Sequence, residues 1–204
     1  IIVNSLLDYV NLQFPSSGTI CAGGSVAIFG QVYEPGVTPG AGTQGAGITA
    51  ELGYSTTNTN PNTWTNWQTA TFNPGGGGAN NDEYQSNLGA SLAPGIYYYT
   101  YRYSFNGCPY QYGGFNVGGG DGFWDGTNDI SGTLTVLADP TAPTNTPAPA
   151  AGTVCVGAVL SITASGSTGG FGTCVYEYAI DPGTGIFGTF GATNTVTVSS
   201  VGNG

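Results

Sequence analysis

Two short runs far apart in the chain have almost the same sequence. Residues 18–23 read GTICAG, and residues 152–157, which begin 134 positions later, read GTVCVG. After each run apolar and small residues alternate, and both matches continue into a Tyr/Glu segment and then an aromatic pair. Self-similarity of this kind indicates a tandem array of related modules. The sequence therefore predicts a second module that begins where the first ends.

Strands dominate the predicted secondary structure. Short β-branched and aromatic runs are separated by Gly, Pro and Asn clusters, which is typical of an all-β chain. We predict tandem Ig-like or fibronectin-like β-sandwiches, the second truncated. The expected strands are residues 6–14, 25–32, 48–55, 68–72, 83–88, 95–105 and 131–137 in the first module, and 159–164, 175–180 and 195–199 in the second. The aromatic run 96–103 predicts a central strand with one face in the core and the other under a loop.

The predicted organisation has three parts. Residues 1–138 form a β-sandwich module, in which residues 1–14 supply an N-terminal strand. Residues 139–151 are a proline-rich linker, because four prolines between positions 139 and 149 favour an extended, semi-rigid spacer. Residues 152–204 form a partial Ig-like repeat, since about 100 residues are needed for a complete sandwich.

Charge composition excludes several classes of partner. One Arg, no Lys, no His and eleven acidic residues give a net charge of -10, whereas binding to nucleic acid requires a basic surface. Anionic membrane surfaces are disfavoured for the same reason, and no apolar stretch is long enough for a membrane-spanning helix. Charged residues make up only 6% of the chain, against about 25% in ordinary globular domains. This composition is typical of exported proteins, so we expect an extracellular location.

The residue types also argue against catalysis. Without His or Lys, neither a Ser-His-Asp nor a Cys-His arrangement can be built. Asp82 and Glu83 are the only adjacent carboxylates, and neighbours on a strand point to opposite faces, so we interpret them as part of a solvated turn. We predict that the chain is not an enzyme and has no cofactor other than calcium.

A calcium site is one interpretation of the aspartates near position 125. Asp121, Asp125 and Asp129 are regularly spaced in a glycine-rich segment, and calcium prefers clusters of oxygen ligands. The spacing is not that of an EF-hand, and Gly-Asp-Gly is equally a turn signal. A plain turn is the alternative.

Three tryptophans could stack on sugar rings. Trp64, Trp67 and Trp124 lie in or near predicted loops, and they are the candidate glycan ligands. The alternative is that they fill the core. In an extended segment, the spacing of Trp64 and Trp67 would place their rings on opposite faces, which argues against a single platform.

Arg102 is the only cation, and it lies within the most aromatic strand. We predict a structural ion pair with Asp82, Glu83 or another carboxylate, or stacking on a neighbouring tyrosine. An anion or sugar clamp is the alternative function. Loss of Arg102 is expected to remove packing as well as charge.

Four cysteines in an oxidising exterior are expected to pair. In an immunoglobulin-type topology, Cys21 and Cys108 would lie at opposite ends of the first module, too far apart for a bond. Cys174 would lie at the end of the second module that faces the first. We therefore predict an interdomain bridge between Cys21 and Cys174, with Cys155 meeting a partner elsewhere.

Six motifs carry a resemblance to a known class of module. They are residues 30–38, 53–55, 60–67, 81–84, 94–99 and 122–127. In this order they resemble a β-sandwich module of secreted Bacteroidota proteins, and from Pro140 onward the chain is similar to the Ig-like repeats of giant surface adhesins exported by type IX secretion, including gliding adhesins.

The resemblance implies a non-enzymatic structural or adhesive region at the N-terminus of a large protein on the bacterial cell surface. It also implies partners: other domains of the same long chain, and type IX outer-membrane machinery or surface glycans. Two alternatives remain. One is a carbohydrate-binding accessory module of a secreted protein, and the other is subunit assembly in which residues 1–3 add a strand to an exposed sheet edge.

Overall fold

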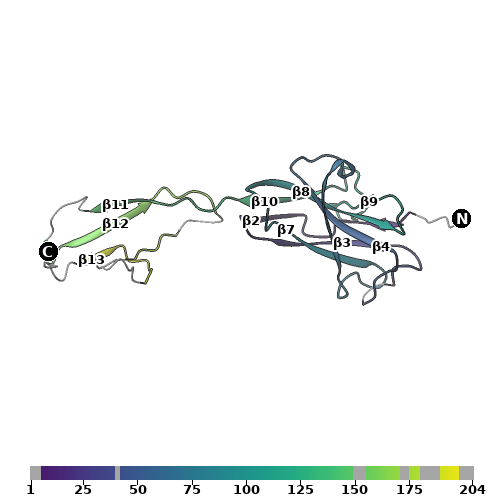
Figure 1. Cartoon of the computed structure of the whole chain (residues 1–204), viewed down its shortest axis with the longest axis horizontal. Helices are drawn as coiled ribbons and strands as arrows, with labels where there is room; N and C mark the ends of the chain where they lie inside the picture. The colour runs from purple at the N-terminus through teal and green to yellow at the C-terminus, as the bar shows by residue number, and fades with distance from the viewer. Residues whose placement is uncertain (1–5, 40–41, 149–154, 171–174, 180–188, 198–204) are drawn as a thin grey trace. The chain divides into compact units, whose positions relative to one another are not determined.

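The computed structural model describes residues 6–39, 42–148, 155–170, 175–179 and 189–197. The chain divides into two compact units, Ile1–Ala138 and Asp139–Gly204 (Figure 1). Within the described residues, the only helix is one turn of 3-10 helix, η1 (Pro61–Thr63), so the all-β prediction is confirmed. No helix among these residues is long and apolar enough to cross a membrane.

The first unit is a sandwich of two sheets (Figure 1). One sheet has the order β1-β3-β7-β6, and the other has the order β2-β10-β8-β4-β5, with β9 also paired to β8. All neighbours are antiparallel except β2 and β10, which are parallel. The strands are β1 (Tyr9–Val10), β2 (Ser17–Cys21), β3 (Val26–Tyr33), β4 (Ile48–Ser55), β5 (Asn66–Thr69), β6 (Thr71–Phe72), β7 (Asp82–Leu88), β8 (Gly95–Phe105), β9 (Gln111–Tyr112) and β10 (Gly132–Leu137).

The core lies between these two sheets. Ile28 and Tyr84 contribute from one sheet, and Leu52, Tyr101 and Leu134 contribute from the other. All are buried, and the inward positions recur at every second residue of β3, β4 and β10. This alternation follows from the pleat of a strand, in which successive side chains point to opposite faces.

The aromatic strand β8 is central, as predicted. It pairs with β4 on one side and with β10 and β9 on the other. Its tyrosines at 97, 99, 101 and 103 are buried in the core. On the opposite face, Thr100 and Ser104 are also buried, and their hydroxyls donate to the carbonyls of Gly113 and Cys108 in the segment that follows β8. The expectation of a covering loop is confirmed.

Several strands differ from their predicted bounds. The predicted strand 68–72 divides into β5 and β6, which belong to different sheets. The chain crosses at buried Ala70, whose N–H donates to the Ala50 carbonyl. The predicted strand 6–14 reduces to β1 and a single bridge between Phe14 and Phe29. Strand β2 was not predicted, because SGTIC has only one large apolar side chain that would indicate burial.

The second unit contains a three-stranded sheet in the order β11-β12-β13. Its strands are β11 (Thr144–Ala148), β12 (Val159–Ser165) and β13 (Thr195–Thr197). The predicted linker over residues 139–151 is therefore wrong for residues 144–148, because they form β11 and pair with β12. Pro147 is compatible with this edge position because an edge strand needs hydrogen bonds on one side only. The described part of the predicted strand 175–180 makes a single bridge, between Tyr178 and Gly191.

The repeated motif folds into the same turn in both units. The Gly24 N–H donates to the Cys21 carbonyl at 2.9 Å, and the Ala158 N–H donates to the Cys155 carbonyl at 3.0 Å. The third residue of each turn is a glycine with positive φ, 77° at Gly23 and 88° at Gly157. A side chain is strained in this conformation, which explains why glycine stands two positions after each cysteine. Residues 1–3, the predicted donor strand, lie outside the described residues.

Gly30 offers a test of the packing around β8. A Cβ atom at this position would overlap the Tyr101 ring and the Tyr103 hydroxyl and lie 2.9 Å from the Asn11 carbonyl. We expect Gly30→Ala to lower the free energy of unfolding by about 2 kcal/mol, because overpacked cores must distort. Urea denaturation measures this change. The matched control is Gly95→Ala, where the nearest atom would lie at an ordinary 3.8 Å; equal stability of the two variants would contradict the prediction.

Candidate functional site

Arg102 lies on the outer face of the β8 sheet and forms an ion pair across the strands. Glu51 is its direct neighbour on β4. The Arg102 Nε atom donates to Glu51 Oε2 at 2.7 Å, and the two side chains are 19% and 22% exposed. The predicted ion pair with a carboxylate is confirmed, but the named partners Asp82 and Glu83 are wrong. Both belong to β7, which lies in the other sheet.

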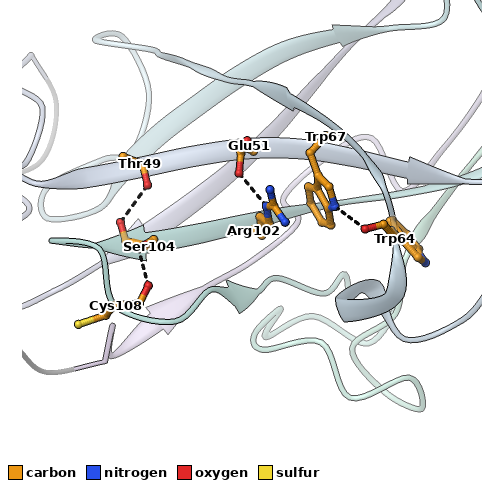
Figure 2. A network of polar contacts seen from close by, with 7 residues as sticks. All are labelled: Thr49, Glu51, Trp64, Trp67, Arg102, Ser104 and Cys108. Atoms are coloured by element: carbon orange, nitrogen blue, oxygen red, sulfur yellow. Dashed lines mark hydrogen bonds and ion pairs between the residues drawn. The ribbon is translucent and has the colours of Figure 1, made fainter.

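Aromatic rings cover both sides of the guanidinium. The Arg102 Cζ atom lies 4.1 Å from the Trp67 ring centroid and 3.9 Å from that of Tyr110. Figure 2 shows Glu51, Arg102 and Trp67 side by side on neighbouring strands. Cation–π contacts strengthen when the charge is partly desolvated, as it is here. The expected stacking on a tyrosine is confirmed, and a tryptophan adds to it.

Local structure explains the position of Trp67. Its cross-strand neighbour is Gly53, and a Cβ atom there would overlap the indole. Glycine at position 53 therefore lets the indole lie across β4. The Trp67 Nε1–H donates to the Trp64 carbonyl at 3.0 Å (Figure 2).

Trp64 and Trp67 stack, with centroids 6.1 Å apart and an interplanar angle of 29°. Opposite faces were expected only for a continuous strand, and that condition is not met, because Trp64 is the C-cap of η1 and β5 begins only at Asn66. Trp64 is buried, and its Nε1–H donates to the Thr59 carbonyl at 3.1 Å. The two indole N–H groups are thus used within the protein.

The turn after β8 brings two tyrosines to the same face. Residues Asn106 and Gly107 have positive φ, and the chain then returns beside β8 so that Tyr112 pairs with Arg102 in register. The Tyr112 ring lies 5.9 Å from Trp67, and Tyr110 is 40% exposed. A hydrogen bond with Glu51 and partial burial raise the pKa of Tyr110. The cluster of Glu51, Trp67, Arg102 and the two tyrosines is called the Arg102 cluster below.

Asp82 and Glu83 occupy buried positions, so their interpretation as a solvated turn is wrong. Asp82 lies at one end of the core, where its Oδ2 accepts the Gly45 N–H at 2.6 Å and its Oδ1 has no hydrogen-bond partner. Burial raises the pKa of this carboxyl. Glu83 accepts a short hydrogen bond from the Asn73 amide. The sequence did not predict that Asp82 and Glu83 are buried, because acidic side chains are rarely buried in proteins.

Two of the three candidate calcium ligands, Asp121 and Asp125, accept local hydrogen bonds with their carboxylates. Asp125 Oδ1 accepts the backbone N–H groups of residues 127, 128 and 129, which lowers the pKa of Asp125. Asp121 Oδ1 accepts the Asn116 N–H at 2.7 Å, and Asp129 Oδ1 is buried without a partner. No group of three or more acidic, Cys or His side chains that could hold a metal ion occurs in the described part of the chain. A plain turn, the alternative to a calcium site, explains the hydrogen bonds of Asp125.

Trp124 does not join the other two tryptophans in a ring contact. It is half-buried, and its Nε1–H donates to Ser131 Oγ at 3.0 Å. Cys21 and Cys155 are exposed. The partner predicted for Cys21, Cys174, lies outside the described residues, so this bridge remains a prediction.

Comparison with protein-family models and with curated proteins gives no match for this chain. Its chemistry must therefore be read from the site. The Arg102 cluster combines one neutralised ion pair with three aromatic rings. Such a cluster can hold the outer face of the sheet rigid and present Tyr110 to solvent.

Replacement of Arg102 tests whether the cluster is structural. We expect Arg102→Ala to lower the free energy of unfolding by about 2 kcal/mol, because it removes two ring contacts and leaves Glu51 unpaired. Glu51→Gln keeps an acceptor and both rings, so we expect it to cost under about 1 kcal/mol. Thermal and urea denaturation measure both. A melt unchanged by Arg102→Ala would refute a structural role.

Asp82 should make stability depend on pH. Since its pKa is raised above 3.8 in the folded state, the folded protein binds more protons than the unfolded chain just above this value, and stability falls as the pH rises through this window. We expect Asp82→Asn to be more stable than the wild type by about 1 kcal/mol near neutral pH, with the difference shrinking on acidification.

Urea denaturation measures the stability difference between Asp82→Asn and the wild type at two pH values. One is about pH 4, near the ordinary pKa of Asp, and the other is about pH 7. Asp125→Asn is the control of opposite sign, because its lowered pKa makes the ionised form stabilising. A stability difference between Asp82→Asn and the wild type that is the same at both pH values would contradict the prediction.

Proposed function

We propose that this chain is a non-enzymatic, force-bearing region of a large adhesin or filament protein on a bacterial cell surface, exported by type IX secretion. The resemblance of the sequence to secreted Bacteroidota modules and adhesin repeats supports this proposal. So does the presence of two β-units in tandem. Other domains of the same long chain would be its partners, with outer-membrane export machinery and surface glycans as further candidates.

One observation carries the mechanical part of the proposal. The strand pair β2 and β10 is parallel, with five residue pairs from Ser17↔Thr133 to Cys21↔Leu137. Strand β2 lies near the start of the first unit, and β10 is its last strand. Tension along the chain therefore pulls β2 from its Ser17 end and β10 from its Leu137 end, which are opposite ends of the ladder.

This geometry loads the hydrogen bonds of the pair together. Hydrogen bonds in a parallel ladder are evenly spaced along the strands, so force along the strands strains them as a group, whereas force at one end would open them one by one. The Thr133 N–H donates to the Ser16 carbonyl at 3.0 Å, and the Ala22 N–H donates to the Leu137 carbonyl at 2.8 Å. Leu134 and Val136 anchor β10 in the core.

The alternative is a carbohydrate-binding accessory module that uses the tryptophans. Against it, the three indole N–H groups donate to Thr59, Trp64 and Ser131, and Trp64 is buried. The tryptophans therefore support the structural function better than a glycan platform.

Single-molecule pulling tests the force-bearing function. In the full chain, Ser replaces Cys108, Cys155 and Cys174, which leaves Cys21 as the only thiol. One handle is placed at the C-terminus and the other either at the N-terminus or at Cys21. We expect the first unit to unfold at a markedly higher force from the N-terminus, because attachment at Cys21 opens the β2–β10 pair from one end.

Substitution at the ladder provides a second measurement. Ala22→Pro removes a donor to β10 at the second position of a turn, where proline is well tolerated. We expect it to lower the unfolding force from the N-terminus, while Ala90→Pro, in the turn closed by the Gly89–Leu92 hydrogen bond, should leave it unchanged. Equal forces in the two pulling directions would refute the proposal.

A further inference from the structure

A groove of about 380 Å³ opens beside the Arg102 cluster. Its walls come from the start of β4, from the crossing between β5 and β6, and from the turn that carries Tyr110. Its lining residues are Gln44, Ile48, Thr49, Ala50, Glu51, Thr69, Ala70, Tyr84 and Tyr110. A volume of this size lies within the range of small-molecule sites, about 300–1,000 Å³.

The lining has an apolar base and a polar rim. Ile48, Ala50 and Ala70 are buried apolar residues, whereas Thr69 brings a hydroxyl and Gln44 brings an amide oxygen. The Gln44 Nε2 group already donates to the Tyr84 hydroxyl at 3.0 Å. Hydroxyl and amide groups both donate and accept hydrogen bonds. Tyr110 adds an aromatic ring that is 40% exposed.

The charges around the groove select an uncharged ligand. The one carboxylate of the lining, Glu51, is already paired with Arg102 at 2.7 Å. Arg102 does not line the groove, and its positive charge is balanced by Glu51, so the groove offers no free cation to an anion. The chain as a whole carries a net charge of -10, which further repels anionic ligands.

We propose that this groove binds a neutral oligosaccharide. Sugar rings combine apolar C–H faces with many hydroxyls, and this matches an exposed aromatic ring beside a rim of hydroxyl, amide and carboxylate groups. Tyr110 would stack on a sugar face, and Glu51, Thr69 and Gln44 would bind hydroxyls. The contact between Arg102 and the Tyr110 ring, 3.9 Å to its centroid, holds the ring in place before binding, which reduces the entropic cost.

This site differs from the predicted tryptophan site, because none of the three tryptophans lines the groove. It rests on the adhesive part of the proposed function and names its ligand class. Neither β2 nor β10 contributes to the groove, so its failure would leave the force-bearing part standing.

The test is calorimetric and NMR titration of the full chain with neutral gluco-, xylo- and manno-oligosaccharides, and with oligogalacturonate as the acidic comparison. We expect a neutral oligosaccharide to bind, with Tyr110→Ala weakening affinity at least about tenfold and Thr69→Val weakening it a few-fold. Thr69 is exposed, so this variant tests the groove even if Tyr110→Ala perturbs the fold. The matched control is Phe123→Ala, since Phe123 is 42% exposed and lies outside the groove.

Three results would overturn the proposal. The first is the absence of binding by every neutral oligosaccharide of the panel at millimolar concentration. The second is binding that is unchanged in both Tyr110→Ala and Thr69→Val. The third is tighter binding of oligogalacturonate than of any neutral sugar, which would indicate an anion site at Arg102.

Discussion

Tyrosine hydroxyls on the core face of β8 join this strand to β3 in the other sheet and to the segment between β1 and β2. Tyr99 donates to the Pro15 carbonyl at 2.6 Å, Tyr101 donates to the Ile28 carbonyl at 2.7 Å, and Tyr103 donates to the Asn11 carbonyl at 3.4 Å. Each phenol fills core volume and also satisfies a main-chain acceptor that would otherwise be costly to bury. The structure makes room for these rings at glycines, most clearly at Gly30 and Gly132.

The candidate site depends on these same contacts, because Arg102 alternates with the tyrosines along one strand. Tyr101 and Tyr103 point into the core, so Arg102 between them points outward. Its neighbours in register, Glu51 and Tyr112, are then brought to it from strands on either side. The core contacts that fix β8 therefore also fix the position of the only cation.

The sequence predicted features that depend on local pattern and missed those that depend on register. The aromatic run of β8 indicated a central strand, and this is correct. The named partners of Arg102, Asp82 and Glu83, were wrong because strand order decides which carboxylate lies beside it, and no local pattern encodes strand order. The spacing of Trp64 and Trp67 indicates opposite faces only within one strand, and the sequence did not reveal that η1 ends at Trp64 and β5 begins only at Asn66. The prediction of a linker at β11 is wrong because four prolines between positions 139 and 149 indicate an extended spacer, whereas only one of them lies within the strand.

The assignment of β11 to the second unit bears on how force would pass along the chain. Strand β10 ends at Leu137 and β11 begins at Thr144, so six residues join the sheets instead of the longer linker that was predicted. Strand β11 pairs antiparallel with β12 as β1 does with β3, and Pro149 precedes the second GTxCxG motif as Pro15 precedes the first. A short connection leaves little slack to extend before the next sheet bears load. This is the property that a region under tension requires.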